Sequence, residues 1–369
     1  MSYLRSTLLL VLLVCCQCSV SGRRAIRKKL VANVESYIVN EVGGDRNDVR
    51  SAILAEMAST YEEDTIKNFQ TDLSAIISNV LSGDKNKVEA LMRLALANNQ
   101  DIDSLKDTLE FYLVSDLTGE RNSLEAVADV IYLNGGSAND VESALELITS
   151  YTVNGDRNDM ESLIKLMVGD DASSDEFINT LSTIATATIN GEGNTVEDVL
   201  ELALANDGDI GYLKSIITAI ISTEIEGDYN DVRNIMELSV GTRNFDKDDL
   251  NLNIESIIAN DIVGDKNYVK NIVKLAAAGG RDLEKITLDI EAIISNVVNG
   301  EKNDIRNRLE NRVLQGLKSM DIKATISAII SNQIEGNSND VENIMEFGVA
   351  NKLDDDDSLD RDPFDDDDS

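Results

Sequence analysis

The chain repeats one short sequence segment at an almost constant period. A Gly-x-x-Asn segment occurs nine times, and successive glycines are separated by 39, 36, 36, 36, 36, 37, 36 and 36 residues. The glycine and asparagine pairs are Gly44 and Asn47, Gly83 and Asn86, Gly119 and Asn122, Gly155 and Asn158, Gly191 and Asn194, Gly227 and Asn230, Gly264 and Asn267, Gly300 and Asn303, and Gly336 and Asn339. A fixed period in this range is typical of solenoids, in which each unit buries its apolar side chains against its neighbours. The sequence therefore predicts an elongated array of about nine units.

The apolar residues around each glycine predict two α-helices. They recur at positions −10, −7, −6 and −2 before the glycine, and at +5, +8 and +9 after it. Before Gly227 these positions hold Ile217, Ile220, Ile221 and Ile225. Spacings of three, one and four residues place side chains on one stripe of a helix. We therefore expect an all-α fold, a solenoid-like array of about nine helical hairpins with 36-residue repeats in residues 23–353.

The Gly-x-x-Asn segment is interpreted as the turn between the two helices of a hairpin. Glycine tolerates the left-handed conformation that often ends a helix, and asparagine three residues later is a favourable N-cap for the next one. Five units then place glutamate where it completes a capping box. These glutamates are Glu89, Glu125, Glu161, Glu197 and Glu342. The nine glycines and nine asparagines are thus predicted to be structural turn and cap residues.

Residues 1–22 have the composition of a secretory signal peptide. Arg5 is followed by the apolar run 8–16, and small residues lead up to Gly22. The run is too short to span a bilayer, although an uncleaved anchor is the alternative. Removal of this segment takes all three cysteines with it, at positions 15, 16 and 18. We therefore expect a secreted, extracellular protein that is stable without disulfides.

The composition argues against several functional classes. The chain has no His and no Trp, and its 33 Lys+Arg against 68 Asp+Glu give a formal charge of −35. Without histidine there is no imidazole base, no His-activated nucleophile and no imidazole metal ligand. The negative charge disfavours nucleic acid and anionic membranes as partners. Paired carboxylates can hydrolyse glycosides, but the acids here belong to a repeated surface pattern. We predict that the protein is not an enzyme and has no organic cofactor.

The C-terminal residues 354–369 differ abruptly from the repeats. Ten of these sixteen residues are Asp, which predicts a disordered acidic tail. Carboxylate oxygens are preferred ligands of Ca²⁺, so we expect weak Ca²⁺ binding here, with a dissociation constant of about 10⁻⁴–10⁻³ M. The candidate metal ligands are Asp354, Asp355, Asp356, Asp357, Asp365, Asp366, Asp367 and Asp368.

Five basic residues lie at the other end, within positions 23–29. They are Arg23, Arg24, Arg27, Lys28 and Lys29. One interpretation is a frayed helix start or a processing site. The alternative is a basic head that pairs with the acidic tail of another copy, and the sequence leaves the oligomeric state open.

These features predict a secreted, non-enzymatic structural or matrix protein. In composition it is similar to the acidic secreted proteins of calcified shells and skeletons. That resemblance implies a component of a biomineral or extracellular matrix that binds Ca²⁺ or a calcium mineral surface. The alternative is a secreted acidic helical-repeat scaffold that binds a basic protein partner.

Overall fold

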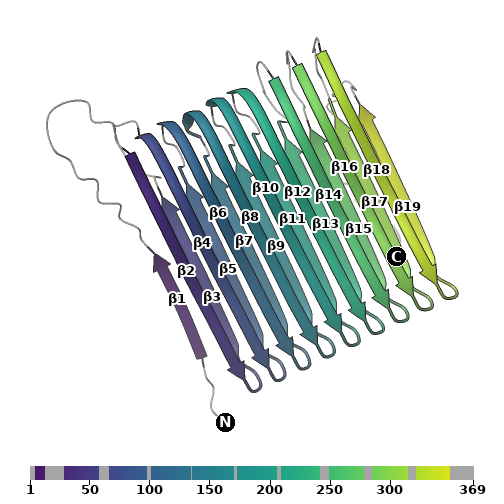
Figure 1. Cartoon of the computed structure of the whole chain (residues 1–369). Coiled ribbons are helices and arrows are strands. Elements are labelled where there is room, and N and C mark those ends of the chain that lie inside the picture. Colours follow the sequence, from purple (N-terminus) through teal and green to yellow (C-terminus); the bar gives the residue numbers. More distant parts are fainter. Residues whose placement is uncertain are drawn as a thin grey trace.

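The described part of the protein is a β-structure, so the prediction of an all-α fold is wrong. The computed structural model describes residues 5–12, 29–57, 66–97, 101–133, 135–169, 173–205, 209–241, 249–277, 285–314 and 321–349. In these ranges the chain forms a parallel β-solenoid of about eight turns with repeats of about 36 residues (Figure 1). The 36-residue repeat is therefore confirmed, but its unit is a pair of strands. None of the described segments is a helix long and apolar enough to cross a bilayer.

The strands of the described residues form two parallel sheets, which we call sheet A and sheet B and whose strands are counted within those residues. Sheet A has 10 strands, in the spatial order β1 (Arg5–Leu12), β3 (Asp48–Met57), β5 (Lys87–Leu96), β7 (Ser123–Tyr132), β9 (Asp159–Val168), β11 (Thr195–Leu204), β13 (Asp231–Val240), β15 (Tyr268–Ala277), β17 (Asp304–Val313) and β19 (Asp340–Val349). Sheet B has 9 strands, β2 (Lys29–Gly43), β4 (Ile66–Ser82), β6 (Asp101–Thr118), β8 (Ser137–Asn154), β10 (Ser173–Asn190), β12 (Asp209–Glu226), β14 (Asp249–Val263), β16 (Lys285–Asn299) and β18 (Asp321–Glu335). β1 lies within residues 1–22, which the sequence predicts to be a signal peptide.

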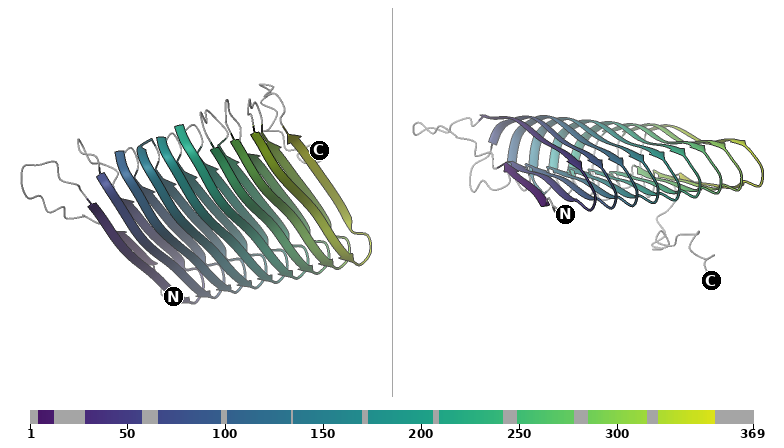
Figure 2. Two further views of the ribbon diagram at one scale, coloured as in Figure 1. Left: turned by 45° about the horizontal axis from the view of Figure 1, so that its top comes forward. Right: turned by 90° about the horizontal axis from the view of Figure 1, so that it is seen from below.

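Each repeat unit follows the same path through the two sheets. A long strand of sheet B ends at the Gly-x-x-Asn turn, which leads into a shorter strand of sheet A. The tight turns line one edge of the molecule, and the two sheets lie face to face (Figures 1 and 2). Neighbouring strands pair one repeat apart, so that Ile220 lies between Ile184 and Ile257. At about 4.8 Å per strand, nine units span about 40 Å, half the length expected for packed helical hairpins.

The hydrophobic core fills the space between the two sheets. In β12, Ile217, Ile221 and Ile225 point inward and are fully buried, whereas Ile220 points to the outer face. The three inward positions are separated by four residues, an even number that fits a strand as well as a helix. The outward isoleucine at −7 is what made the pattern resemble a helical stripe. It recurs on the outer face of sheet B as Ile76, Ile148, Ile184, Ile220, Ile257, Ile293 and Ile329.

The C-terminal half of the core also contains a chain of hydrogen-bonded amides. Its members alternate between the two sheets, and their side chains bond one another over 2.7–3.1 Å. We call this set the interior amide ladder: Asn234, Asn260, Asn271, Asn296, Asn307, Asn332 and Asn343. Because each amide is both donor and acceptor, the ladder satisfies polar groups in the core and holds one register between neighbouring units.

Candidate functional site

The predicted turn residues all lie where sheet B turns into sheet A. The nine glycines have φ values between 105° and 158°, a region that disfavours other residues. The asparagines are not helix caps, because strands flank the turn on both sides. Instead the asparagine side chain of every unit after the first bonds to the preceding unit: Asn194 Oδ1 accepts the backbone N–H of Asn158 at 2.8 Å. The same bond occurs at every junction between consecutive turns, at 2.8–2.9 Å.

The residue after each turn glycine forms an acidic row along the solenoid. Eight of the nine units have an acid here, namely Asp45, Asp84, Glu120, Asp156, Glu192, Asp228, Asp265 and Glu301. Each aspartate accepts the backbone N–H of the next unit's acidic residue, over 2.7–3.0 Å. The glutamates make no such bond, because their longer side chain places the carboxylate further from the turn. The row therefore presents carboxylate groups to solvent at intervals of about 4.8 Å.

A basic row lies beside the acidic row, one position later in the turn. Its members are Arg46, Lys85, Arg121, Arg157, Lys266 and Lys302. All six have left-handed backbone conformations, with φ between 58° and 62°. The turn edge of the solenoid is therefore a strip of mixed charge and is not uniformly acidic.

A run of acidic residues lies on the outer face of sheet A. Glu89, Glu125, Glu161 and Glu197 are direct neighbours in β5, β7, β9 and β11, and we call them the glutamate ladder. In the sequence they seemed to complete capping boxes, but in the sheet they stack in register. Like charges directly opposite each other destabilise a sheet. Such a row is therefore a candidate site for cations.

The ends of the glutamate ladder differ electrostatically from its middle, and Arg233 in β13 is the in-register neighbour of the last member, Glu197. Lys87 lies 2.6 Å and Arg50 lies 3.1 Å from the Glu89 carboxylate. The hydrogen bond from Lys87 is the main cause that lowers the pKa of Glu89. In the middle of the ladder, partial burial raises the pKa of Glu161, and the neighbouring carboxylates of Glu125 and Glu197 raise it further. Protonation or a bound cation would relieve this repulsion.

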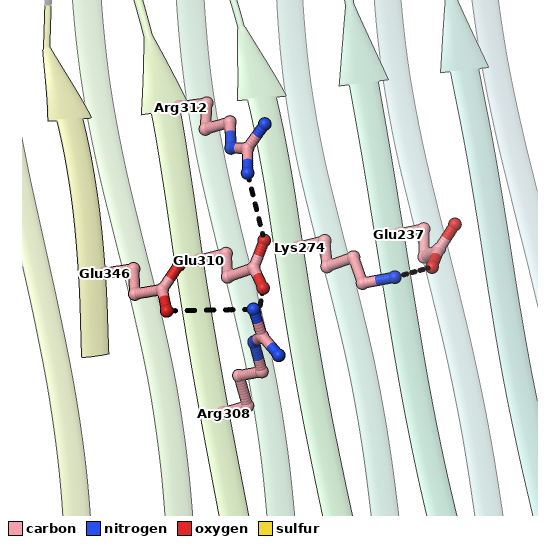
Figure 3. A network of polar contacts seen from close by, with 6 residues as sticks. All are labelled: Glu237, Lys274, Arg308, Glu310, Arg312 and Glu346. Atoms are coloured by element: carbon pink, nitrogen blue, oxygen red, sulfur yellow. Dashed lines mark hydrogen bonds and ion pairs between the residues drawn. The ribbon is translucent and has the colours of Figure 1, made fainter. Parts of the chain in front are cut away.

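The outer face of sheet A also contains a hollow of about 400 Å³. Charged side chains around it pair with one another. Lys165 contacts Glu201 at 3.0 Å, and Lys274 contacts Glu237 at 2.9 Å. In the same region Glu310 is buried between Arg308 and Arg312, and Glu346 approaches Arg308 from the next strand at 3.7 Å (Figure 3). These pairs leave little free charge for a ligand in the hollow.

Among the described residues, two carboxyl groups lie inside the core between the sheets, which the sequence pattern did not indicate. Burial raises the pKa of Asp198 to about 8, and neither of its carboxylate oxygens has a hydrogen-bond partner among the described residues. Burial also raises the pKa of Asp107 to about 7, against the opposing effect of the hydrogen bond that Tyr132 donates to it. Neither residue lines the hollow on sheet A. In the preceding units the equivalent positions hold the small polar residues Ser162 and Thr71. Asp198 and Asp107 therefore differ from these neighbours only in carrying a carboxyl group.

The described residues contain no compact metal site. No three acidic side chains in these ranges are grouped closely enough to hold a metal ion. The eight aspartates of the predicted Ca²⁺ site lie in residues 354–369, outside the described residues. What the described part offers to cations is the acidic row and the glutamate ladder, with one carboxylate per repeat unit.

Comparisons with known proteins give no relative: no protein-family model, no curated protein and no solved structure matches this chain. The functional argument therefore depends on the solenoid and its surface alone.

Proposed function

We propose that the protein is a secreted, non-enzymatic structural component of an extracellular matrix or biomineral that binds Ca²⁺ weakly. The observation that carries the proposal is the glutamate ladder, in which four carboxylates stack in register. Its middle members, Glu125 and Glu161, form no ion pair with another described residue, although Lys87 also attracts Glu125. The acidic tail supports the same proposal from the sequence, since ten of its sixteen residues are Asp.

The arrangement of these carboxylates favours weak binding at many positions. A tight Ca²⁺ site surrounds the ion with six to eight oxygens from a closed loop, whereas a row on a flat sheet offers oxygens from one side only. Water or a mineral surface would have to complete the coordination. A regular row of one-sided ligands suits an ordered surface of calcium ions better than a single ion in solution.

The alternative of a scaffold for a basic protein gains no comparable support. Its helical surface is ruled out by the fold. The hollow on sheet A, which would be the natural recess for a partner side chain, is lined by charges that already form ion pairs. Capture of a basic protein remains a possible outcome of the test below.

The test measures Ca²⁺ binding by calorimetry and adsorption to calcium carbonate and calcium phosphate particles. We expect binding at millimolar calcium, a large loss on deletion of residues 354–369, and a further loss in the variant E125Q/E161Q/E197Q. Glu89→Gln is the matched control, because Lys87 and Arg50 already neutralise that carboxylate. Absence of calcium binding together with unchanged adsorption of the deletion variant would overturn the proposal. A basic protein recovered instead from the source tissue would favour the scaffold.

A further inference from the structure

The C-terminal end of the solenoid is uncovered in the described structure. β18 and β19 each pair with one strand only, on the side of the preceding unit. Their inward-pointing side chains are therefore open at the end: Met345 is 41% exposed, Phe347 is 49% exposed and Val349 is 47% exposed. The corresponding residues one unit earlier, Leu309 and Val313, are completely buried. Solenoids normally carry a polar cap at such an end, because an open edge is a template for pairing with another chain.

The hydrogen bonds left open at the two ends of the solenoid are complementary. At every internal junction an asparagine backbone N–H donates to the side-chain oxygen of the next asparagine. In the last unit, the N–H of Asn339 has no acceptor among the described residues. In the first unit, Asn47 Oδ1 accepts no hydrogen bond from a described residue. One end thus offers the donor that the other end lacks.

The interior amide side chains at the two ends of the solenoid are complementary in the same way, with a donor at one end and an acceptor at the other. Within the ladder, amide nitrogens donate to the asparagine oxygen of the next sheet B strand, as Asn307 donates to Asn332 at 3.1 Å. Asn343, the last member, has no such acceptor in the described residues. Asn40 occupies the equivalent position in β2, and its Oδ1 accepts no hydrogen bond there. An Asn343 amide placed against Asn40 would extend the ladder across a junction between two copies.

The side chains also match when the repeat is continued from one copy to the next. Placing Gly44 of a second copy one unit beyond Gly336 brings Val341 beside Val49 and Met345 beside Ile53. The same register sets Glu342 beside Arg50, as Glu342 already lies beside Arg306 within the chain. The junction therefore repeats the apolar and charge pairing that holds the internal units together.

The N-terminal edge of sheet A already accepts a parallel strand. β1 pairs with β3 from Arg5 opposite Asp48 to Leu12 opposite Ala55. In the register above, β19 of another copy would occupy this same place, with Asp340 opposite Asp48. β1 lies in the segment predicted to be removed during secretion, so processing would free the edge of β3.

We propose that, once residues 1–22 are removed, the end formed by β18 and β19 docks on β2 and β3 of a second copy, and that copies join head to tail into filaments. The proposal rests on the secretion that the proposed function includes, but it does not depend on Ca²⁺. Both sheets would continue through each junction. The leader peptide would keep the unprocessed chain from assembling.

The test uses sedimentation velocity and negative-stain electron microscopy of the secreted chain, whose N-terminus is first established by mass spectrometry. EDTA is present to separate assembly from calcium binding, and about 0.15 M salt screens the net negative charge. We expect species at multiples of the monomer mass that lengthen with protein concentration. The full chain 1–369, produced without processing, should remain monomeric. A processed chain that stays monomeric at all concentrations would overturn the proposal.

Two lysine substitutions locate the contact. Met345→Lys places a charge at the open end and should abolish assembly, while Ile216→Lys, equally exposed but on the outer face of sheet B in the interior strand β12, should leave it intact. Circular dichroism should show unchanged strand content in both variants. If Ile216→Lys abolishes assembly and Met345→Lys does not, the copies associate through their sheet faces and the proposal is wrong. Deletion of 354–369 should also leave assembly intact. Loss of assembly on that deletion would favour instead the pairing of a basic head with the acidic tail.

Discussion

Gly191 packs directly against the backbone carbonyl group of Gly155 in the neighbouring turn. A Cβ atom on Gly191 would lie well under 3.0 Å from the Gly155 carbonyl oxygen, and the φ angle of 147° also disfavours any other residue. The same stacking occurs from Gly83 to Gly336, so the turns touch along the whole edge of the solenoid. Glycine is therefore required at these positions for close approach as well as for conformation.

We predict that Gly191→Ala destabilises the protein by about 3 kcal/mol or more, through the combined cost of a steric clash and a strained backbone. Gly44 is the matched control in the unprocessed chain, because it also has a positive φ of 105° but no preceding turn of the same chain to clash with. Gly44→Ala should cost only about 1 kcal/mol. Urea unfolding followed by circular dichroism measures both. Equal losses would show that conformation, and not stacking, determines the requirement for glycine.

The asparagine bonds between turns predict a second effect on stability. Asn194→Ala removes the acceptor of the Asn158 N–H and leaves that buried donor unsatisfied, which costs about 1–3 kcal/mol. Asn337→Ala removes a hydrogen bond of similar length, 3.0 Å to Glu301, but on an exposed turn. We expect this control to change the free energy of unfolding by less than about 0.5 kcal/mol. Hydrogen exchange of the Asn158 amide offers an independent measurement, since that amide should lose protection in Asn194→Ala alone.

The repeat could be predicted from the sequence, but the secondary structure of its units could not. Nine Gly-x-x-Asn segments at a fixed period define the units and the turns whatever the flanking structure is. The helix prediction failed at specific positions. Ile220 is apolar but faces outward, while Ser215 and Thr223 are polar but face inward, so strict alternation is lost. The strands of sheet B, at 15 to 18 residues, also have the length of ordinary helices.

The candidate site was visible in the sequence only as a set of similar positions. Glu125 and Glu161 occupy the same place in consecutive units, which indicates that they are equivalent but not that they touch. In a helical array, equivalent residues lie about 8–10 Å apart, whereas in a β-solenoid they lie about 4.8 Å apart. The electrostatic meaning of the repeat therefore depends on the fold. The buried Asp198 could not be predicted, because nothing in the pattern distinguishes inward acids from outward ones.

Asp198 gives a prediction about pH. Its pKa is raised to about 8 in the folded protein, against about 3.9 for an unfolded aspartate. Between these values the folded state binds the proton more tightly than the unfolded state, so stability falls as the pH rises from about 4 to about 8. Asp198→Asn should remove this loss, and its amide can bond Asn234, its neighbour in β13. We expect a gain of at least about 2 kcal/mol at neutral pH that shrinks toward pH 4.

The measurement for Asp198 is a series of urea unfolding curves from acid to mildly alkaline pH, for the natural protein and the variant together. Taking the difference between the two proteins cancels the contribution of all other acids. A difference that does not change with pH would mean that the Asp198 carboxyl is not held neutral in the core.

The glutamate ladder predicts opposite effects for two equivalent residues. Glu161→Gln removes a carboxylate whose pKa is raised by burial and by its neighbours, so it should stabilise the calcium-free protein by about 0.2–1 kcal/mol. Glu89→Gln removes a carboxylate whose pKa is lowered by Lys87 and should be slightly destabilising. Because the pKa of Glu161 is raised in the folded protein, its carboxylate destabilises the fold only where an unfolded glutamate is ionised. The stabilisation by Glu161→Gln therefore appears as the pH rises above about 4.3, the pKa of an unfolded glutamate, and vanishes below it. Calcium should stabilise the natural protein more than Glu161→Gln, because the cation relieves the repulsion that the variant lacks. Thermal melts in EDTA and in calcium measure both effects, and an identical calcium response in the two proteins would remove the ladder from the proposed cation surface.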